Sequence, residues 1–330
     1  MRNARHREPS AVLNRPTRRS AVSAELTIHP PLPLIEGDHD ALVVRAPAKI
    51  NLNLLVGSRR DDGYHPLDSI VAQVSLYDTL SLRLTDDGEV KLDCEGPDCG
   101  PADQNLALRA AELLAERCGA PGGVRIRLQK QIPPGAGLGG GSSDAAAVLK
   151  GLRRLWKLDI SDEQLVELAA ELGSDVPLFL GPPVCRMRGR GEIIEPLEAA
   201  AAWVLLILPG IHCSTRAVYE AFDHEPEIMA GQTEFADLLQ PPSRWREDLQ
   251  NQLGPAARRV SPTLANLWDA LRTSLPVTPM LTGSGSALFC LCDHEKELQA
   301  VAAAVSVERL PLCCGVRMLS QDGPDAPGAG

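Results

Sequence analysis

Five glycines lie among the seven residues from Gly135 to Gly141, directly after Pro133 and Pro134. Glycine allows positive φ angles and lets a backbone approach a ligand closely. The run continues into Ser142 and Ser143, which suit the cap or first turn of a following helix. A glycine loop that leads into a helix N-terminus presents free N–H groups and the positive end of the helix dipole. The stretch therefore predicts a phosphate-binding loop.

The segments on either side of this loop predict a strand and a helix. Before it, apolar and polar residues alternate with the period of a half-buried strand, at Val124, Ile126 and Leu128. After it, apolar residues recur at helical spacing, at Ala145, Val148, Leu149 and Leu152. A strand, a glycine loop and a helix in this order are the context that a phosphate site needs.

Other glycine loops fit less well. Gly135, Gly137 and Gly140 match the spacing of a dinucleotide fingerprint, but that motif follows a buried apolar strand directly. A Walker A loop is excluded because no lysine follows the glycines. A plain flexible turn would account for one or two glycines, whereas five would add conformational entropy to the unfolded chain without return.

Three further stretches carry residues capable of chemistry. Lys49 lies in the strand-like segment APAKINL beside Asn51, where it is either a functional lysine or a lysine that protects an edge strand. Asp175 in SDVPLF is either a functional carboxylate or a helix cap. Tyr64 and His65 in DGYH belong to a polar turn. Lys49 and Asp175 taken alone favour the structural interpretation, whereas the turn at Tyr64 and His65 suits either one.

Composition limits the class of protein. The net charge of −10 argues against broad binding to nucleic acid or to an anionic membrane. The longest apolar run is shorter than the ~20 residues of a membrane span. The nine cysteines are an odd number without a C-x-x-C pair, which predicts reduced thiols and a cytoplasmic protein.

The pattern of apolar residues predicts an α+β fold in two domains. We expect residues 1–40 to be a disordered basic tail, with a transit peptide as the alternative, and residues 321–330 to be a disordered tail. The first domain covers 41–198 and the second 199–320, with the boundary near Glu198. At the start of the first domain, Pro47 is expected to separate two strands. Short strands are expected at Ile70–Leu76 and Thr79–Leu84.

The glycine loop resembles the signature P-x-x-G-L-G-S/G-S-S of the GHMP kinases. APAKINL, DGYH, PPGAGLGGGSSDAA, SDVPLF, RGRGE and LTGSGSALF occur in the order and spacing of one branch of that family, which phosphorylates 4-diphosphocytidyl-2-C-methyl-D-erythritol. The resemblance extends from Val43 to Leu319. It implies a GHMP kinase fold, with an N-terminal domain like domain 2 of ribosomal protein S5 and a ferredoxin-like C-terminal domain.

The resemblance also implies the parts of a kinase site. ATP phosphates would lie against the residues Pro133, Pro134, Gly135, Ala136, Gly137, Leu138, Gly139, Gly140, Gly141, Ser142 and Ser143. Asp175 would be the general base, and Lys49 would keep it ionised and orient the hydroxyl group. Mg²⁺ would be held mainly through ATP, with Ser142 as the candidate protein contact.

The cytidine-diphosphate substrate would contact Asn51, Tyr64, His65, Thr215 and Tyr219. The resemblance implies that the Tyr64 ring would stack on cytosine, that His65 would bond the edge of the base, and that Tyr219 would close the sandwich. The expected partner is therefore a small molecule rather than nucleic acid or a membrane, and we expect a monomer or weak homodimer. The alternatives are a homoserine- or mevalonate-type kinase and a catalytically silent nucleotide sensor with the same fold.

Overall fold

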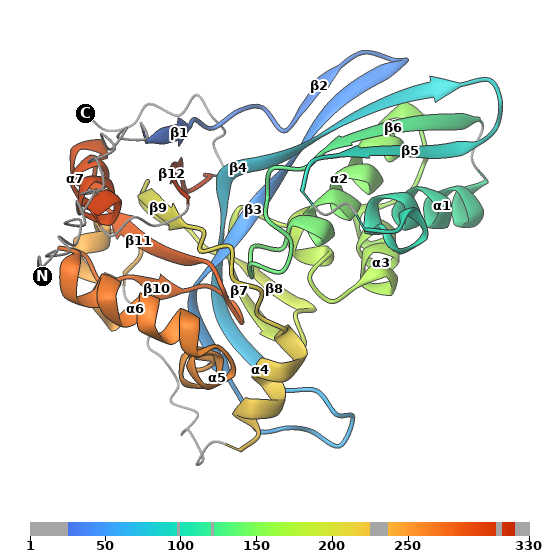
Figure 1. Ribbon diagram of the computed structural model, residues 1–330. Helices are drawn as coiled ribbons and strands as arrows, with labels where there is room; N and C mark the ends of the chain where they lie inside the picture. Colours follow the sequence, from blue (N-terminus) through green and yellow to red (C-terminus); the bar gives the residue numbers. More distant parts are fainter. Residues whose placement is uncertain (1–25, 98–99, 120–121, 225–236, 308–311, 321–330) are drawn as a thin grey trace, which may run out of the picture.

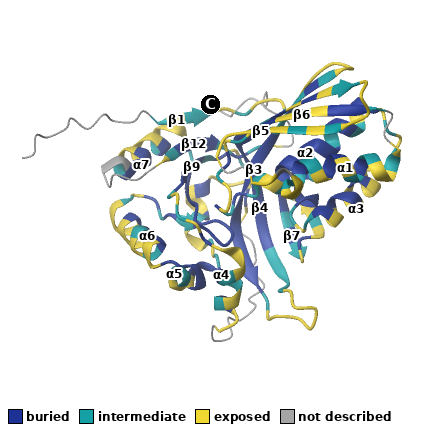
Figure 2. Cartoon of the chain, turned by 45° about the vertical axis from the view of Figure 1, so that its right-hand side comes forward, coloured by how far each residue is buried: buried dark blue, intermediate teal, exposed yellow. Residues whose placement is uncertain are grey.

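Two long antiparallel strands, β3 (Ala41–Val56) and β4 (Leu67–Thr85), run through the centre of the molecule (Figure 1). The computed structural model describes residues 26–97, 100–119, 122–224, 237–307 and 312–320. Both strands are almost fully buried over most of their length (Figure 2). They are buried because helices cover one part of them and a second sheet packs against another.

The first sheet has the order β2-β3-β4-β6-β5, and β7 and β8 extend it from β4. Its further strands are β2 (Ile35–Gly37), β5 (Val90–Glu95), β6 (Gly123–Gln129), β7 (Val184–Gly189) and β8 (Ile193–Pro196). The helices that pack on it are α1 (Leu106–Cys118), α2 (Gly140–Leu155) and α3 (Asp162–Leu172), with short 3₁₀ turns η1 (Ala102–Gln104) and η2 (Pro177–Leu180). Their apolar sides form one core with the sheet.

The second sheet has the order β1-β12-β9-β11-β10. Its strands are β1 (Thr27–His29), β9 (Trp203–Ile207), β10 (Met280–Leu281), β11 (Leu288–Cys292) and β12 (Cys313–Arg317). The accompanying helices are α4 (Thr215–Phe222), α5 (Gly254–Val260), α6 (Pro262–Ser274) and α7 (Glu295–Val307), with η3 (Pro242–Arg244) and η4 (Arg246–Asp248). The mixture of helices with largely antiparallel strands is the predicted α+β class.

The strand β3 contributes to both layers of the molecule because its side chains change sides at Pro47. Leu42, Val44 and Ala46 belong to the core under the helices. Ala48 and Ile50 have the same parity but belong to the core between the two sheets. A register shift between Pro47 and Ala48 separates the two groups, and such irregularities increase local twist. Pro47 was predicted to end a strand, but the strand continues through this shift, and β4 is likewise one strand and not two.

Helix starts follow the local signals in the sequence. Asn105, Ser161, Ser214 and Ser261 each accept a backbone N–H bond at the N-cap of a helix. The helix after the glycine loop differs, because its N-cap is Gly139 and no side chain caps it. Ser142 and Ser143 therefore lie within its first turn and do not cap it.

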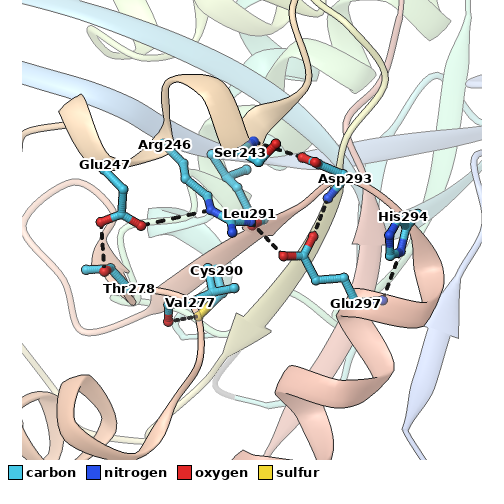
Figure 3. Close-up of polar contacts among 10 residues, drawn as sticks. All are labelled: Ser243, Arg246, Glu247, Val277, Thr278, Cys290, Leu291, Asp293, His294 and Glu297. Carbon is cyan, nitrogen blue, oxygen red and sulfur yellow. Dashed lines mark hydrogen bonds and ion pairs between the residues drawn. The ribbon is translucent and has the colours of Figure 1, made fainter.

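A polar network holds the segment of η3 and η4 against the second sheet (Figure 3). Arg246 donates to the Leu291 carbonyl oxygen at 2.9 Å and to Glu297 at 2.9 Å. Glu297 also accepts the Asp293 N–H at 2.8 Å, and Asp293 accepts the Ser243 N–H at 2.8 Å. These bonds join the end of β11 to the start of α7.

The prediction of a disordered tail up to Asp40 is wrong for its last part, while residues 1–25 lie outside the described residues. β1 pairs in parallel with β12, and β2 pairs with β3. Ser75 donates to the His29 carbonyl oxygen at 2.5 Å, and the Arg45 N–H donates to the Leu34 carbonyl oxygen at 2.7 Å. The error arose because strands of three residues interrupted by prolines carry no readable period.

Two other expectations concern the domain boundary and the cysteines. The first sheet ends at Pro196 and the second resumes at Trp203, on either side of Glu198. Because β1 belongs to the second sheet and β3 contributes to all three clusters of buried apolar residues, a division into 41–198 and 199–320 stays a prediction. Cys94 is disulfide-bonded, so the prediction of uniformly reduced thiols is wrong at this position, where the absence of a C-x-x-C pair gave no signal.

Candidate active site

Lys49 and Asn51 lie on β3 with buried side chains. The Nζ atom of Lys49 donates to Asn51 Oδ1 at 2.6 Å, and Asn51 Nδ2 donates to Ser69 Oγ at 2.9 Å. Burial lowers the pKa of Lys49, and the negative charge of Asp175 opposes this shift. β2 pairs with β3 only at Leu42–Val44, and at Lys49 the glycine loop covers this side of β3, so Lys49 does not protect an exposed sheet edge.

The glycine loop connects β6 to α2 and needs glycine at several positions. Gly135, Gly137 and Gly139 have φ angles of 68°, 80° and 73°. A Cβ atom on Gly137 would lie 2.5 Å from the Thr282 carbonyl oxygen. The Lys49 N–H donates to the Leu138 carbonyl oxygen at 2.9 Å, which fixes the loop on β3. Because no side chain caps α2, its N-terminus can receive an anion.

The turn from Thr282 to Ser286, between β10 and β11, packs on the glycine loop. The Ala287 N–H donates to the Ala136 carbonyl oxygen at 3.1 Å, and Thr282 Oγ1 accepts the Asn51 N–H at 3.0 Å. The hydroxyl groups of Thr215 and Ser284 are 2.9 Å apart. The turn therefore contacts β3, the glycine loop and α4. It does more than connect two strands.

Asp175 lies in the turn between α3 and η2 and is half-buried. It does not act as a helix cap, because the N-cap of η2 is Val176 and no side chain caps this turn. Its charge acts on Lys49 and also on Tyr219. Burial, with the added effect of Asp175, raises the pKa of Tyr219 to about 12. The charge of the Asp175 carboxylate therefore reaches both the buried ammonium group of Lys49 and the phenol of Tyr219.

A cavity of about 490 Å³ opens beside Asp175. Its lining includes many charged side chains and comes from the DGYH turn, the Asp175 turn, the β7–β8 turn and α4: Arg59, Gly63, Tyr64, His65, Leu67, Ser174, Asp175, Arg190, Thr215, Arg216, Tyr219, Glu220 and Asp223. Five residues predicted from the sequence are among them. Lys49, Asn51 and residues 133–143 of the glycine loop are not among the lining residues.

The ring of His65 is already engaged on both nitrogens. Its Nδ1 atom is 2.9 Å from the Gly57 carbonyl oxygen, and its Nε2 atom is 3.1 Å from Asp223 Oδ1. The ring also packs on Tyr219 with 5.4 Å between centroids. A hydrogen bond from this ring to a base edge would require one of these contacts to open. The structure therefore gives His65 the position of a support for the cavity wall.

Sequence reasoning missed the charged residues of the cavity. Arg190 lies over the ring of Tyr64, with 3.7 Å from its Cζ atom to the ring centroid. Arg59 pairs with Asp223 at 3.4 Å, and Arg216 pairs with Glu220 at 2.8 Å. Arg190 belongs to the motif RGRGE, whose pattern alone indicates no role for it. Its spacing from Asp175 gave no sign that the β7–β8 turn folds back over Tyr64.

Comparison with known proteins identifies the family. Residues 105–181 match the family GHMP kinases N terminal domain. The 4-diphosphocytidyl-2-C-methyl-D-erythritol kinase of Chromobacterium violaceum is 37% identical over 261 residues, which cover 79% of this chain and 89% of that protein. This chain belongs to that kinase family. The predicted recognition is therefore confirmed.

Solved structures agree with this membership. A crystal structure of 4-(cytidine 5'-diphospho)-2C-methyl-D-erythritol kinase is 36% identical, with a TM-score of 0.71 over 84% of this chain and 98% of the other. A homoserine kinase from Cytophaga hutchinsonii has a TM-score of 0.64 over 86% of this chain and 96% of the other, at 17% identity. The second likeness shows the fold alone. The predicted GHMP kinase fold is confirmed.

The structure brings the predicted residues to one region but leaves their roles as predictions. The glycine loop is bonded to β3, the strand that carries Lys49 and Asn51. Asp175 lines the cavity together with Tyr64, His65, Thr215 and Tyr219. Tyr64 is 49% exposed, so its ring lies at the rim of the cavity. None of the helices in the described ranges has the length and apolar character needed to cross a bilayer.

Proposed function

We propose that this chain uses ATP to phosphorylate the 2-hydroxyl group of 4-diphosphocytidyl-2-C-methyl-D-erythritol, in the non-mevalonate route to isoprenoid precursors. The observation that carries the proposal is the cavity that joins the DGYH turn to Asp175. Homoserine and mevalonate contain no nucleobase. A kinase for either of them would therefore have no ligand group to fill the aromatic end of this cavity. A silent sensor would have no need of a carboxylate whose charge acts on a buried lysine.

In this proposal Asp175 accepts the proton of the 2-hydroxyl group as the oxygen attacks the γ-phosphorus of ATP. Lys49 would orient the hydroxyl group, and the charge of Asp175 opposes the effect of burial on the pKa of this lysine. Asn51 holds the lysine through their 2.6 Å bond. The catalytic contribution of the chain is positioning and charge stabilisation, as in other phosphoryl transfers.

ATP fits the glycine loop for two reasons visible in the structure. The loop has glycines at the positions where its backbone lies closest to neighbouring residues, so no side chain fills this space. The N-terminus of α2 has no side-chain cap. Ser143 Oγ is buried and makes no hydrogen bond among the described residues, so an oxygen is available beside the cradle. Ser142 and Ser143 would hold Mg²⁺ together with the phosphates. The ion would neutralise charge that develops on the phosphate oxygens.

At the other end of the cavity, the rings of Tyr64 and Tyr219 would stack on cytosine. The guanidinium of Arg190 covers one face of Tyr64, so the base takes the other face or displaces the guanidinium. Thr215, at the start of α4, would contact the part of the substrate between the base and the hydroxyl group. Monomer or weak homodimer and a cytoplasmic location stay part of the proposal.

The test is phosphate transfer to three acceptors. The purified chain is given ATP and Mg²⁺ with 4-diphosphocytidyl-2-C-methyl-D-erythritol, homoserine or mevalonate, and ADP release and the ³¹P NMR spectrum are recorded. We expect ADP release and a new phosphomonoester signal with the first acceptor alone. Equal turnover of homoserine or mevalonate would contradict the proposed substrate. No turnover with any of the three acceptors would favour a catalytically silent nucleotide sensor.

A further inference from the structure

A buried group of three charged residues lies next to the glycine loop and outside the cavity. They are Asp78 of β4, Lys130 after the end of β6 and Asp144 of α2. The Lys130 Nζ atom donates to Asp78 Oδ2, and to Asp144 Oδ2 at 2.6 Å. Asp78 is fully buried and Asp144 is 2% exposed. The mechanism above uses none of the three.

Asp78 also holds the backbone where the loop begins. Its Oδ1 atom accepts the N–H groups of Gln131 at 2.5 Å and Ile132 at 2.8 Å. These two residues directly precede Pro133. Because prolines have no N–H group, the next two residues of the loop cannot donate to anything. The two bonds to Asp78 therefore use the last backbone donors that can anchor the loop before its first glycine.

The same carboxylate lies against the start of α2. A Cβ atom on Gly140, the first residue of the helix, would be 3.3 Å from Asp78 Oδ2. Through Lys130 the carboxylate is also tied to Asp144, one turn further along the helix. Figure 1 shows α2 beside β4, with which it packs. One side chain thus sets the loop entry and the helix start relative to each other.

We propose that Asp78 is a positioning residue for the nucleotide, acting through the Gln131 and Ile132 N–H groups and through Lys130 on the shape of the glycine loop. This inference rests on the proposed function only in that the loop binds ATP. A loop shaped by buried, charge-assisted bonds holds its N–H groups in place before the phosphates arrive. Loss of these bonds weakens ATP binding more than it alters the acceptor site.

The variant that tests the inference is Asp78→Asn, which keeps an acceptor oxygen but places an amide against Lys130. Its control is Asp68→Asn. Asp68 lies on the same strand, in the part that pairs with β7, and makes a two-bond ion pair with Arg186 at 2.8 and 2.6 Å. Both variants remove a charge from an ion pair of β4, and because the Asp68 pair is more exposed, Tm is measured for both variants to separate lost stability from weaker ATP binding.

The measurements are Kd by calorimetry for an ATP analogue with a nonhydrolysable β–γ bridge plus Mg²⁺, and the kinetic constants for both substrates. In Asp78→Asn we expect about a tenfold rise in Kd for the analogue and in KM for ATP. KM for the acceptor and kcat at saturation should change less than about threefold. In Asp68→Asn all of these constants should stay within about twofold of the wild type.

Equal ATP constants in Asp78→Asn and the wild type would overturn the inference, as would equal rises in Asp68→Asn. If Asp78→Asn does not fold, Asp144→Asn takes its place, since it keeps the loop anchors and weakens only the tie to α2. It should raise Kd about threefold, and an unchanged Kd would overturn the inference. A wild-type protein that does not bind the analogue would overturn the proposed function as well.

Discussion

At the scale of single residues, the site depends on a lysine that is expensive to bury. Lys49 is 7% exposed, and the charge of Asp175 offsets part of the effect of burial on its pKa. A lysine in a strand is an ordinary observation in a sequence, so APAKINL alone did not distinguish function from edge protection. Burial of the side chain and its bond to Asn51 make that distinction.

Replacing the proposed base tests its role directly. Asp175→Asn should lower kcat by about 10²–10⁴-fold, because general-base catalysis contributes roughly that much. Kd for ATP should stay near the wild-type value, since Asp175 lines the cavity and not the glycine loop. Steady-state kinetics and calorimetry check both. Asp159→Asn, at an exposed position, is the control, and more than about a tenth of wild-type kcat in Asp175→Asn would refute the assignment.

The pH dependence of turnover tests Lys49. Because burial lowers its pKa from the ordinary value of 10.5, Lys49 loses its proton at a lower pH than an exposed lysine does. As pH rises through this lowered pKa, the ammonium group disappears and kcat should fall. We expect the alkaline limb of a kcat–pH profile to have its midpoint below 10.5. A profile that stays flat up to that pH would mean that the charge on Lys49 is not needed.

At the scale of elements, the loop and helix signals in the sequence were reliable and the short strands were not. The glycine loop was predicted because five glycines among seven residues are more than a plain turn needs, and the structure places three of them at positive φ. The cavity wall was only partly predicted. Its arginines reach Tyr64 and Asp223 through contacts between residues far apart in the chain, and these leave no local pattern.

Gly137 should be intolerant of a side chain. In Gly137→Ala the Cβ atom would lie 2.5 Å from the Thr282 carbonyl oxygen, at a φ of 80°. We expect a lower Tm for the ligand-free protein, by about 2 °C or less for each ~1 kcal/mol lost, because the shift per kcal/mol decreases with chain length. Gly141→Ala is the control, because its Cβ atom would meet nothing closer than 3.8 Å and alanine favours the helix. Equal Tm values for the two variants would show that the close approach has no cost.

The two N-terminal strands should contribute to stability. Removal of residues 1–37 deletes the pairing of β1 with β12 and of β2 with β3, and also the bonds from Ser75 and Arg45 to this segment. Thermal unfolding should show a clear fall in Tm for this truncation. Removal of residues 1–25 alone, which keeps both strands, should cause a smaller change. The reverse order of the two Tm values would contradict the stabilising role of the strands.

At the scale of the whole molecule, three clusters of buried apolar residues meet on β3, the third of them at Leu54 and Val56. β3 and β4 serve the helical layer at one end and the second sheet at the other, with the change of side at Pro47. The α+β class followed from the order of predicted elements, but this sharing did not, because periodicity identifies a buried face without identifying what covers it. The sharing places Lys49 and Asn51 where the glycine loop and the turn from the second sheet meet.

The central claim is that one cavity holds cytosine at Tyr64 and presents a hydroxyl group to Asp175, and base selection tests it most directly. We would measure kcat/KM for the cytidine substrate and its uridine analogue with the wild type, Tyr64→Ala and Tyr64→Phe. The wild type should prefer cytosine by at least about tenfold. A protein group that accepts a hydrogen bond from the exocyclic amine of cytosine would face the carbonyl oxygen of uracil and lose that bond. Tyr64→Ala should raise KM for the cytidine substrate by about 10- to 100-fold, since stacking is worth ~1–3 kcal/mol per base. Tyr64→Phe should keep the wild-type KM, and KM for ATP should not change. No base preference in the wild type, together with an unchanged KM in Tyr64→Ala, would contradict the claim.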